Sequence, residues 1–237
     1  MIKKCFNYCR NTFLAIGIST VTLIFSIFFS CCNFKSSKLD NNISKYEIEI
    51  FSNEISKLGL ENVDTLLDIG SSFGAHDAII FKFFPNIQFV LLDIDLKYSK
   101  MNNSFLQQNG KKKYFKNNAQ FILGQFDSIP ILSNSHKTIL CRKTVHEFVN
   151  QNKMIQEIRR VLTYDGTVII EEAIPKKVDE IDPYCNMPYL SKSQLIELFS
   201  RNGFKILSQD STTMKFRINK NNNSNLNILK FKKTDLH

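Results

Sequence analysis

The chain has 237 residues, 43% of them hydrophobic, which suits one folded domain with a sizeable core and excludes a disordered chain. The formal net charge is +9, but the positive excess lies in residues 1–45 and 213–237, each with six Lys or Arg against one Asp. The body between these ends is close to neutral. This argues against nucleic-acid binding, because a phosphate-binding groove needs clustered Lys and Arg on the folded body.

Residues 1–33 are predicted to form a signal peptide or membrane anchor. Three basic residues precede an apolar run, and no charge occurs between Arg10 and Lys35, a pattern typical of export signals and N-terminal anchors. The run ends in Ser30-Cys31, which resembles a bacterial lipoprotein signal with Cys31 as the lipidated residue. Both interpretations place the body at a membrane and outside the cytoplasm. A coincidental hydrophobic tail is the third interpretation.

Residues 34–43 are polar without periodicity and predict a tether to a domain of residues 44–237. Only two of the six cysteines, Cys141 and Cys185, lie in this domain. No Cys/His spacing in the chain resembles a zinc site, so no metal is expected from the sequence.

The domain alternates amphipathic helices with short apolar strands. Helices are predicted at residues 44–60, 75–84, 96–110, 152–162 and 191–203, the last of these capped by Ser191 or Ser193. Strands are predicted at residues 64–70, 88–95, 119–126, 137–143, 167–174, 204–211 and 226–233, with a turn at Asp165-Gly166 and an Asn-rich connection at 220–227.

This alternation predicts an α/β fold, a Rossmann-like three-layer sandwich around a mainly parallel seven-stranded sheet. The last two strands follow each other without a helix, which predicts an antiparallel strand at one edge. Ligands of such sheets bind at the carboxyl ends of the strands, and the first strand ends at Asp68 and Gly70. Gly70 and Gly74 then form either a tight structural turn or a bare backbone against which a ligand lies.

Four segments in this order resemble motifs of the class I S-adenosyl-L-methionine-dependent methyltransferases, and the domain resembles their methyltransferase type 11-like members. The segments are LLDIGSSFG, FVLLDID, GQFDSIP and IQEIRRVLTYDGTVIIEE. The resemblance implies S-adenosylmethionine as the cofactor. The alternative dinucleotide fingerprint G-x-G-x-x-G is not met, which disfavours a nicotinamide enzyme.

The resemblance assigns the first segment to the amino-acid end of the cofactor. Gly70, Gly74 and Ser72, which stands where the family has a middle glycine, would let the backbone approach the methionine tail. Asp68 would orient this loop and the ammonium group of the cofactor.

The resemblance assigns the second and third segments to the nucleoside. Asp93 would accept hydrogen bonds from the ribose hydroxyls, with Asp95 as its rival at the strand end. Gln125 and Phe126 would frame the adenine. Gln125 stands where relatives often have an acid, for which Asp127 is a possible substitute.

Acceptor-side residues are expected after the fourth and fifth strands. His146, beside Glu147, is the candidate for a catalytic proton transfer, and a surface or helix-start histidine is the alternative. Tyr184, Cys185 and Tyr189 lie in the loop expected to cover the acceptor.

Two functions follow from these observations. The first is an S-adenosylmethionine-dependent methyltransferase acting on a small or membrane-proximal acceptor. The second is a membrane-tethered binding module with a weakened site, because Ser72, Gln125 and Lys137 all depart from the family pattern.

Overall fold

The computed structural model describes residues 54–72, 74–97, 118–177, 180–219 and 222–234. The predicted signal or anchor, the tether and most of the helices expected at 44–60 and 96–110 lie outside these residues. Of the first expected helix, the structure describes the short 3-10 helix η2 (Ile55–Leu58). Among the described helices, none combines the length and the apolar character needed to cross a bilayer.

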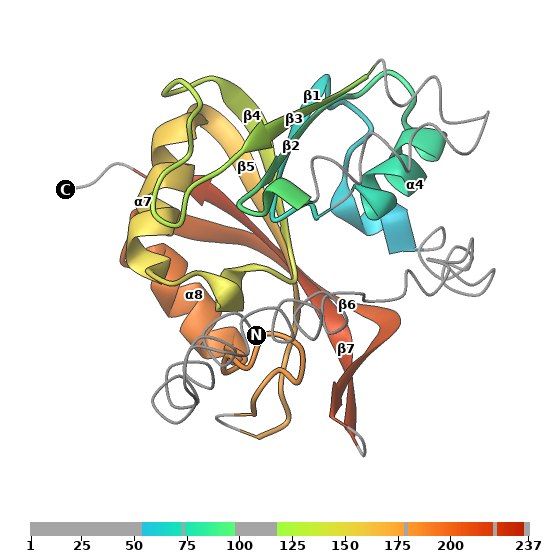
Figure 1. Cartoon of the computed structure of the whole chain (residues 1–237), viewed down its shortest axis with the longest axis vertical. Helices are drawn as coiled ribbons and strands as arrows, with labels where there is room; N and C mark the ends of the chain where they lie inside the picture. Colours follow the sequence, from blue (N-terminus) through green and yellow to red (C-terminus); the bar gives the residue numbers. More distant parts are fainter. Residues whose placement is uncertain (1–53, 73, 98–117, 178–179, 220–221, 235–237) are drawn as a thin grey trace, which may run out of the picture. The chain divides into compact units, whose positions relative to one another are not determined.

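Seven strands form one sheet in the order β3-β2-β1-β4-β5-β7-β6 (Figure 1). Their bounds are β1 Thr65–Ile69, β2 Gln88–Asp93, β3 Ala119–Leu123, β4 His136–Arg142, β5 Leu162–Ala173, β6 Phe204–Asn219 and β7 Asn222–Lys233. Strands β1 to β5 pair in parallel, whereas β7 pairs antiparallel with both β5 and β6. The predicted α/β class and mainly parallel sheet are confirmed. The antiparallel strand is β7, and it lies second from the edge, inside β6.

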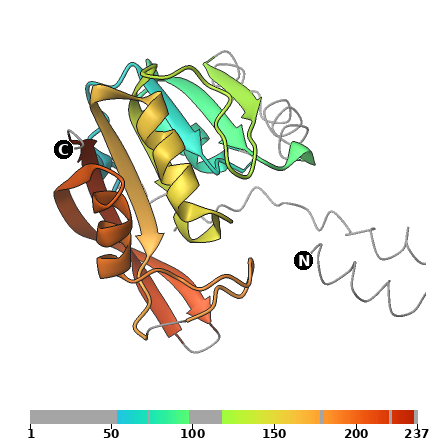
Figure 2. The same cartoon turned by 90° about the vertical axis from the view of Figure 1, so that its left-hand side faces the viewer.

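Helices cover both faces of the sheet. The helix α4 (Ala75–Phe83) lies on one face, and α7 (Gln151–Val161) and α8 (Lys192–Ser200) lie on the other (Figures 1 and 2). The predicted apolar stripe of α7 is buried against the sheet, in a core cluster that includes Ile139, Val168 and Phe231 of three strands. Burying these branched and aromatic side chains is the main stabilising term of such a fold.

The helix α8 is capped by Ser191 rather than by Ser193. The Ser191 hydroxyl accepts a hydrogen bond from the Gln194 amide at 3.2 Å, and the Gln194 side chain accepts one from the Ser191 amide at 2.7 Å. This reciprocal pair is a capping box, which satisfies two backbone donors at the helix start.

Two local predictions were wrong. Asp165-Gly166 lies inside β5, where the register with β4 shifts between the pairs His136–Leu162 and Thr138–Thr167. The glycine is required there, because a Cβ would lie 2.9 Å from the Lys137 carbonyl oxygen. The Asn-rich segment 220–227 is mostly strand, since β6 and β7 continue to Asn219 and from Asn222.

Candidate active site

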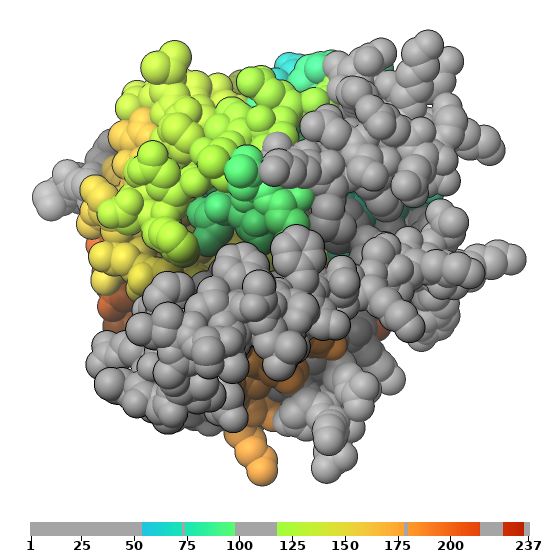
Figure 3. Space-filling model, viewed as in Figure 1, coloured from blue at the N-terminus to red at the C-terminus, as the bar shows by residue number. Residues whose placement is uncertain are grey.

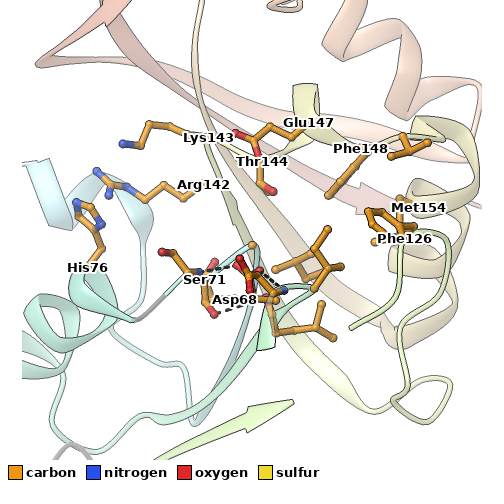
Figure 4. Close-up of a pocket in the computed structure, with 18 of the residues that line it drawn as sticks. Asp68, Ser71, His76, Phe126, Arg142, Lys143, Thr144, Glu147, Phe148 and Met154 are labelled. Carbon is orange, nitrogen blue, oxygen red and sulfur yellow. Dashed lines mark hydrogen bonds between the residues drawn. The ribbon is translucent and has the colours of Figure 1, made fainter. Parts of the chain in front are cut away.

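A cavity of about 650 Å³ opens at the carboxyl ends of β1, β2 and β4. The neighbours of β1 are β2 on one side and β4 on the other, so the chain changes direction along the sheet at this point. Ligands of open α/β sheets bind at such a switch point. Figure 4 shows His76, Arg142 and Lys143 at one side of the cavity and Phe126 and Met154 at the other.

The loop after β1 forms the floor of the cavity. The Gly70 and Ser71 amides donate to the Leu92 carbonyl at 2.8 and 3.2 Å, which ties the loop to β2. Gly70, Ser72 and Gly74 all have positive φ, at 80°, 53° and 76°. A Cβ on Gly70 would lie 2.3 Å from the Thr144 hydroxyl. Gly70 is therefore needed for both its backbone angle and its contact with Thr144.

Asp93 faces this loop from the end of β2. Its Oδ2 accepts from the Ser72 amide at 2.8 Å, and its Oδ1 accepts from the Asp95 amide at 3.0 Å. Burial raises the pKa of Asp93, although the backbone donors oppose the rise. A carboxylate has about four lone-pair sites, so Asp93 can accept further hydrogen bonds from a ligand.

Asp68 and Asp77 form a buried acidic pair beneath the loop. They are 4% and 1% exposed, and Oδ1 of Asp68 and both carboxylate oxygens of Asp77 have no hydrogen-bond partner. Burial, with the charge of Asp77, raises the pKa of Asp68 well above its usual value, and burial raises the pKa of Asp77 to about 6. Asp68 also lies on the cavity wall.

Arg142 brings positive charge to the same end of the cavity. Its Nε donates to Glu171 Oε2 at 2.5 Å and its Nη2 to Oε1 at 3.4 Å, which fixes the guanidinium between β4 and β5. Lys143 follows it on the cavity wall.

Exposed apolar residues line the cavity beyond Asp93. Ile94 is 47% exposed and Phe126 is 63% exposed, and the segment that carries Phe126 lies at the surface in the space-filling view (Figure 3, yellow-green). The Gln125 side-chain oxygen accepts from the Ser128 hydroxyl at 2.9 Å, which leaves one lone pair for a ligand.

His146 lies in a buried polar network behind the wall after β4. It is 2% exposed, and its Nδ1 lies 3.0 Å from Glu172 Oε2. Burial alone would lower the pKa of His146, but the hydrogen bond and charge of Glu172, with the charges of Glu147 and Asp182, raise it overall. Tyr189 donates to Asp182 Oδ2 at 2.6 Å and its ring lies 5.0 Å from that of His146.

Six of the eight site residues expected from the sequence line the cavity: Asp68, Gly70, Ser72, Asp93, Gln125 and Phe126. Gly74 lies behind the loop as the N-cap of α4, and His146 lies behind Glu147. Of the expected acceptor loop, Tyr184 lines the cavity.

Sequence reasoning did not single out Arg142, Thr144, Glu172 or Asp182. The first three lie at the carboxyl ends of β4 and β5, so their position after two apolar strands was the available signal.

The comparisons with known proteins agree on one family. A family model described as "Methyltransferase domain" matches residues 60–220. The uncharacterized methyltransferase YcgJ of Bacillus subtilis (strain 168) is 29% identical over 122 residues, which cover 51% of this chain and 45% of the relative. The matched part thus spans less than half the length of that relative.

Solved structures share the fold. A SAM-dependent methyltransferase from Aquifex aeolicus superposes with a TM-score of 0.62 at 15% identity, over 79% of this chain and 93% of that one. The structure of Bacillus subtilis YcgJ gives a TM-score of 0.59 at 21% identity, over 79% and 99%. The [4+2]-cyclase SpnF gives 0.63 at 14% identity, over 79% and 81%.

Proposed function

The chain belongs to the methyltransferase domain family, and on this premise we propose that its cavity binds S-adenosylmethionine and transfers the methyl group to a small acceptor. The single observation that carries the proposal is Asp93, a buried carboxylate that faces the glycine-containing loop across an open cavity at the strand-order switch. This is where a ribose diol meets an acid in nucleotide-binding sheets.

The residues on the cavity wall fit each part of this cofactor. Asp68 on the cavity wall suits the ammonium, and Arg142 and Lys143 suit the carboxylate of the methionine tail. Asp93 suits the ribose. Ile94 and Phe126 would lose their exposure to water against the adenine, whose burial stabilises the complex.

When bound, the cofactor supplies a methyl group on a sulfonium, and the protein contributes mainly alignment. A base is needed only if the acceptor nucleophile carries a proton. Glu147 is the carboxylate on the cavity wall after β4 that could take such a proton. His146 lies behind it with Nε2 3.9 Å from Glu147 Oε1, so its contribution would be to position Glu147.

Isothermal titration of the full chain with S-adenosylhomocysteine, the demethylated product, tests the binding step. We expect one site per chain. The proposal would be contradicted if S-adenosylhomocysteine gave no heat of binding and S-adenosylmethionine did not compete with it for the chain, both at millimolar concentration.

We further propose that residues 1–33 hold the domain at a membrane and that the acceptor is membrane-proximal. The support is the basic segment, the uncharged apolar run and Cys31 at its end. A C-terminal reporter fusion locates the domain, and a cytoplasmic signal would contradict the expected orientation. Metabolic lipid labelling that survives Cys31→Ser would exclude lipidation at that cysteine.

A binding module without methyl transfer is the second candidate. Gln125 replaces an acid, and its oxygen is partly used by Ser128. The [4+2]-cyclase SpnF also has this fold. Tight binding of S-adenosylhomocysteine without methyl transfer to any acceptor in membrane extracts would favour this candidate over the enzyme.

A further inference from the structure

A cluster of metal-ligand side chains lies at the acceptor end of the cavity. His146, Glu147 and Cys185 each offer one ligand atom, and these atoms all lie within 4.8 Å of one another. Glu147 follows β4 in the 3-10 helix η4 (Val145–Glu147), and Cys185 lies in the loop after β5. Two neighbouring parallel strands therefore deliver the three groups to one edge of the sheet.

The His146 ring is oriented as in metal-binding histidines. Glu172 lies 3.0 Å from Nδ1, and its other oxygen accepts from the Val145 amide at 2.8 Å, so this carboxylate is fixed in place. A carboxylate on Nδ1 holds the proton there and leaves the lone pair on Nε2, which is the usual outer-sphere arrangement for a metal-binding histidine.

Nε2 of His146 is buried, has no hydrogen-bond partner, and points into the cluster. It lies 3.9 Å from Glu147 Oε1 and 3.5 Å from Asp182 Oδ2. An unsatisfied buried nitrogen is costly unless something binds it. A cation would satisfy the nitrogen and would also compensate the surrounding carboxylates.

We propose that His146 Nε2, the Glu147 carboxylate and the Cys185 sulfur bind a divalent transition metal of the zinc type. Nitrogen, oxygen and sulfur donors together suit zinc better than magnesium or calcium. Bonds of about 2.0–2.3 Å require the ligand atoms to contract to roughly 3.5 Å apart. The Glu147 side chain is 48% exposed, so it can make this movement. The Cys185 thiol loses its proton to solvent when the sulfur–metal bond forms.

Asp182 is a neighbour of this site rather than a required ligand. Its Oδ2 accepts from the Tyr189 hydroxyl, and its Oδ1 accepts from the Tyr184 and Cys185 amides at 2.6 and 3.2 Å.

Three protein ligands leave one coordination position open, as in zinc sites that act on substrates. Glu147 and Asp182 both line the cavity, so the open position faces it. An acceptor with a hydroxyl or thiol nucleophile would bind there and lose its proton more readily.

The test uses the full chain in detergent, stripped of metal and titrated with Co²⁺. We expect a thiolate-to-cobalt charge-transfer band that Cys185→Ser removes. We also expect Glu147→Gln to bind Co²⁺ more weakly. Glu172→Gln should weaken Co²⁺ binding by about 10- to 100-fold, as for other outer-sphere carboxylates. His136→Gln and Cys141→Ala, which change the same residue types elsewhere in the described part of the chain, should leave the titration unchanged.

Because Cys5, Cys9, Cys31 and Cys32 could also bind cobalt, the Cys185→Ser comparison is decisive. A band that is equally strong in this variant would place the ion on those cysteines and overturn the proposal. Absence of any band in the parent chain would overturn it as well. S-adenosylhomocysteine binding, measured on each variant, shows that the domain is folded and separates failure of this site from failure of the proposed methyltransferase function.

Discussion

Asp93 and Asp95 lie two residues apart at the end of β2, yet their carboxylates have different surroundings. Asp93 is buried against the Ser72 amide, whereas the side chain of Asp95 accepts from the exposed Lys97 amide at 2.8 Å. Only Asp93 therefore faces the loop expected to hold the cofactor. The sequence left this choice open, because both acids follow the same strand.

We predict that Asp93→Asn weakens S-adenosylhomocysteine binding by at least about tenfold. Hydrogen bonds to a charged group contribute about 1.5–3 kcal/mol, and about 1.4 kcal/mol is tenfold in affinity. Asp95→Asn is the matched control and should leave the affinity unchanged in isothermal titration. Equal losses in both variants would remove the ribose-binding role of Asp93.

Asp77 makes the stability of the domain dependent on pH. Burial raises its folded-state pKa from the ordinary value of 3.8 to about 6, against the lowering effects of the neighbouring Asp68 and Arg142. Between these two pH values the folded chain keeps a proton that the unfolded chain has lost. The free energy of unfolding therefore falls as pH rises from about 4 to about 6.

Asp77→Asn should make this decline shallower in urea unfolding across the same pH range, because the amide mimics the protonated acid. Asp68, whose pKa burial also raises, should account for the decline that remains. Asp64→Asn, a change at the exposed residue just before β1, should retain the decline. A parent chain with constant stability from pH 4 to 6 would show that the Asp77 carboxyl is not perturbed by burial.

At the scale of elements, regular patterns were predictable and local exceptions were not. The α7 stripe at Met154, Ile155 and Ile158 identified a helix, because such spacing places these side chains on one face. Asp165-Gly166 indicated a turn, but the pairing of Leu162 and Thr167 with β4 on either side keeps it within β5. Tertiary pairing therefore outweighed the local preference of Asp-Gly for a turn.

The cap of α8 gives an element-scale prediction. Ser191→Ala should lower the free energy of unfolding by about 1 kcal/mol, because it removes the acceptor for the Gln194 amide. Ser193→Ala changes a serine that lies two residues on and contacts Ser191 at 3.0 Å without capping the helix. Thermal unfolding should show a smaller shift for Ser193→Ala, and the reverse order would reassign the cap.

At the scale of the whole molecule, the edge of the sheet that carries the site was predictable and the pairing of side chains was not. Glu171 and Glu172 are adjacent in β5, so they point to opposite faces, one to Arg142 and the other to His146. His146 and Cys185 lie far apart in the sequence, and only the parallel pairing of β4 with β5 brings them together. The spacing of residues along the sequence does not predict such a contact.

Ligand binding should stabilise the whole domain. S-adenosylhomocysteine at 100 times its dissociation constant should raise the free energy of unfolding by about 2.7 kcal/mol, because it binds only the folded chain. Thermal unfolding of the full chain measures this shift, and methionine, which lacks the nucleoside, is the control. An equal shift with methionine would mean that the nucleoside half of the cavity is not used.

The position of β7 also bears on when the domain can fold during synthesis. This strand, Asn222–Lys233, lies between β5 and β6 and pairs with both. Until the ribosome has released these residues, β6 has no neighbour and the exposed edge of β5 stays open. The growing polypeptide therefore cannot complete its sheet before this strand has been made.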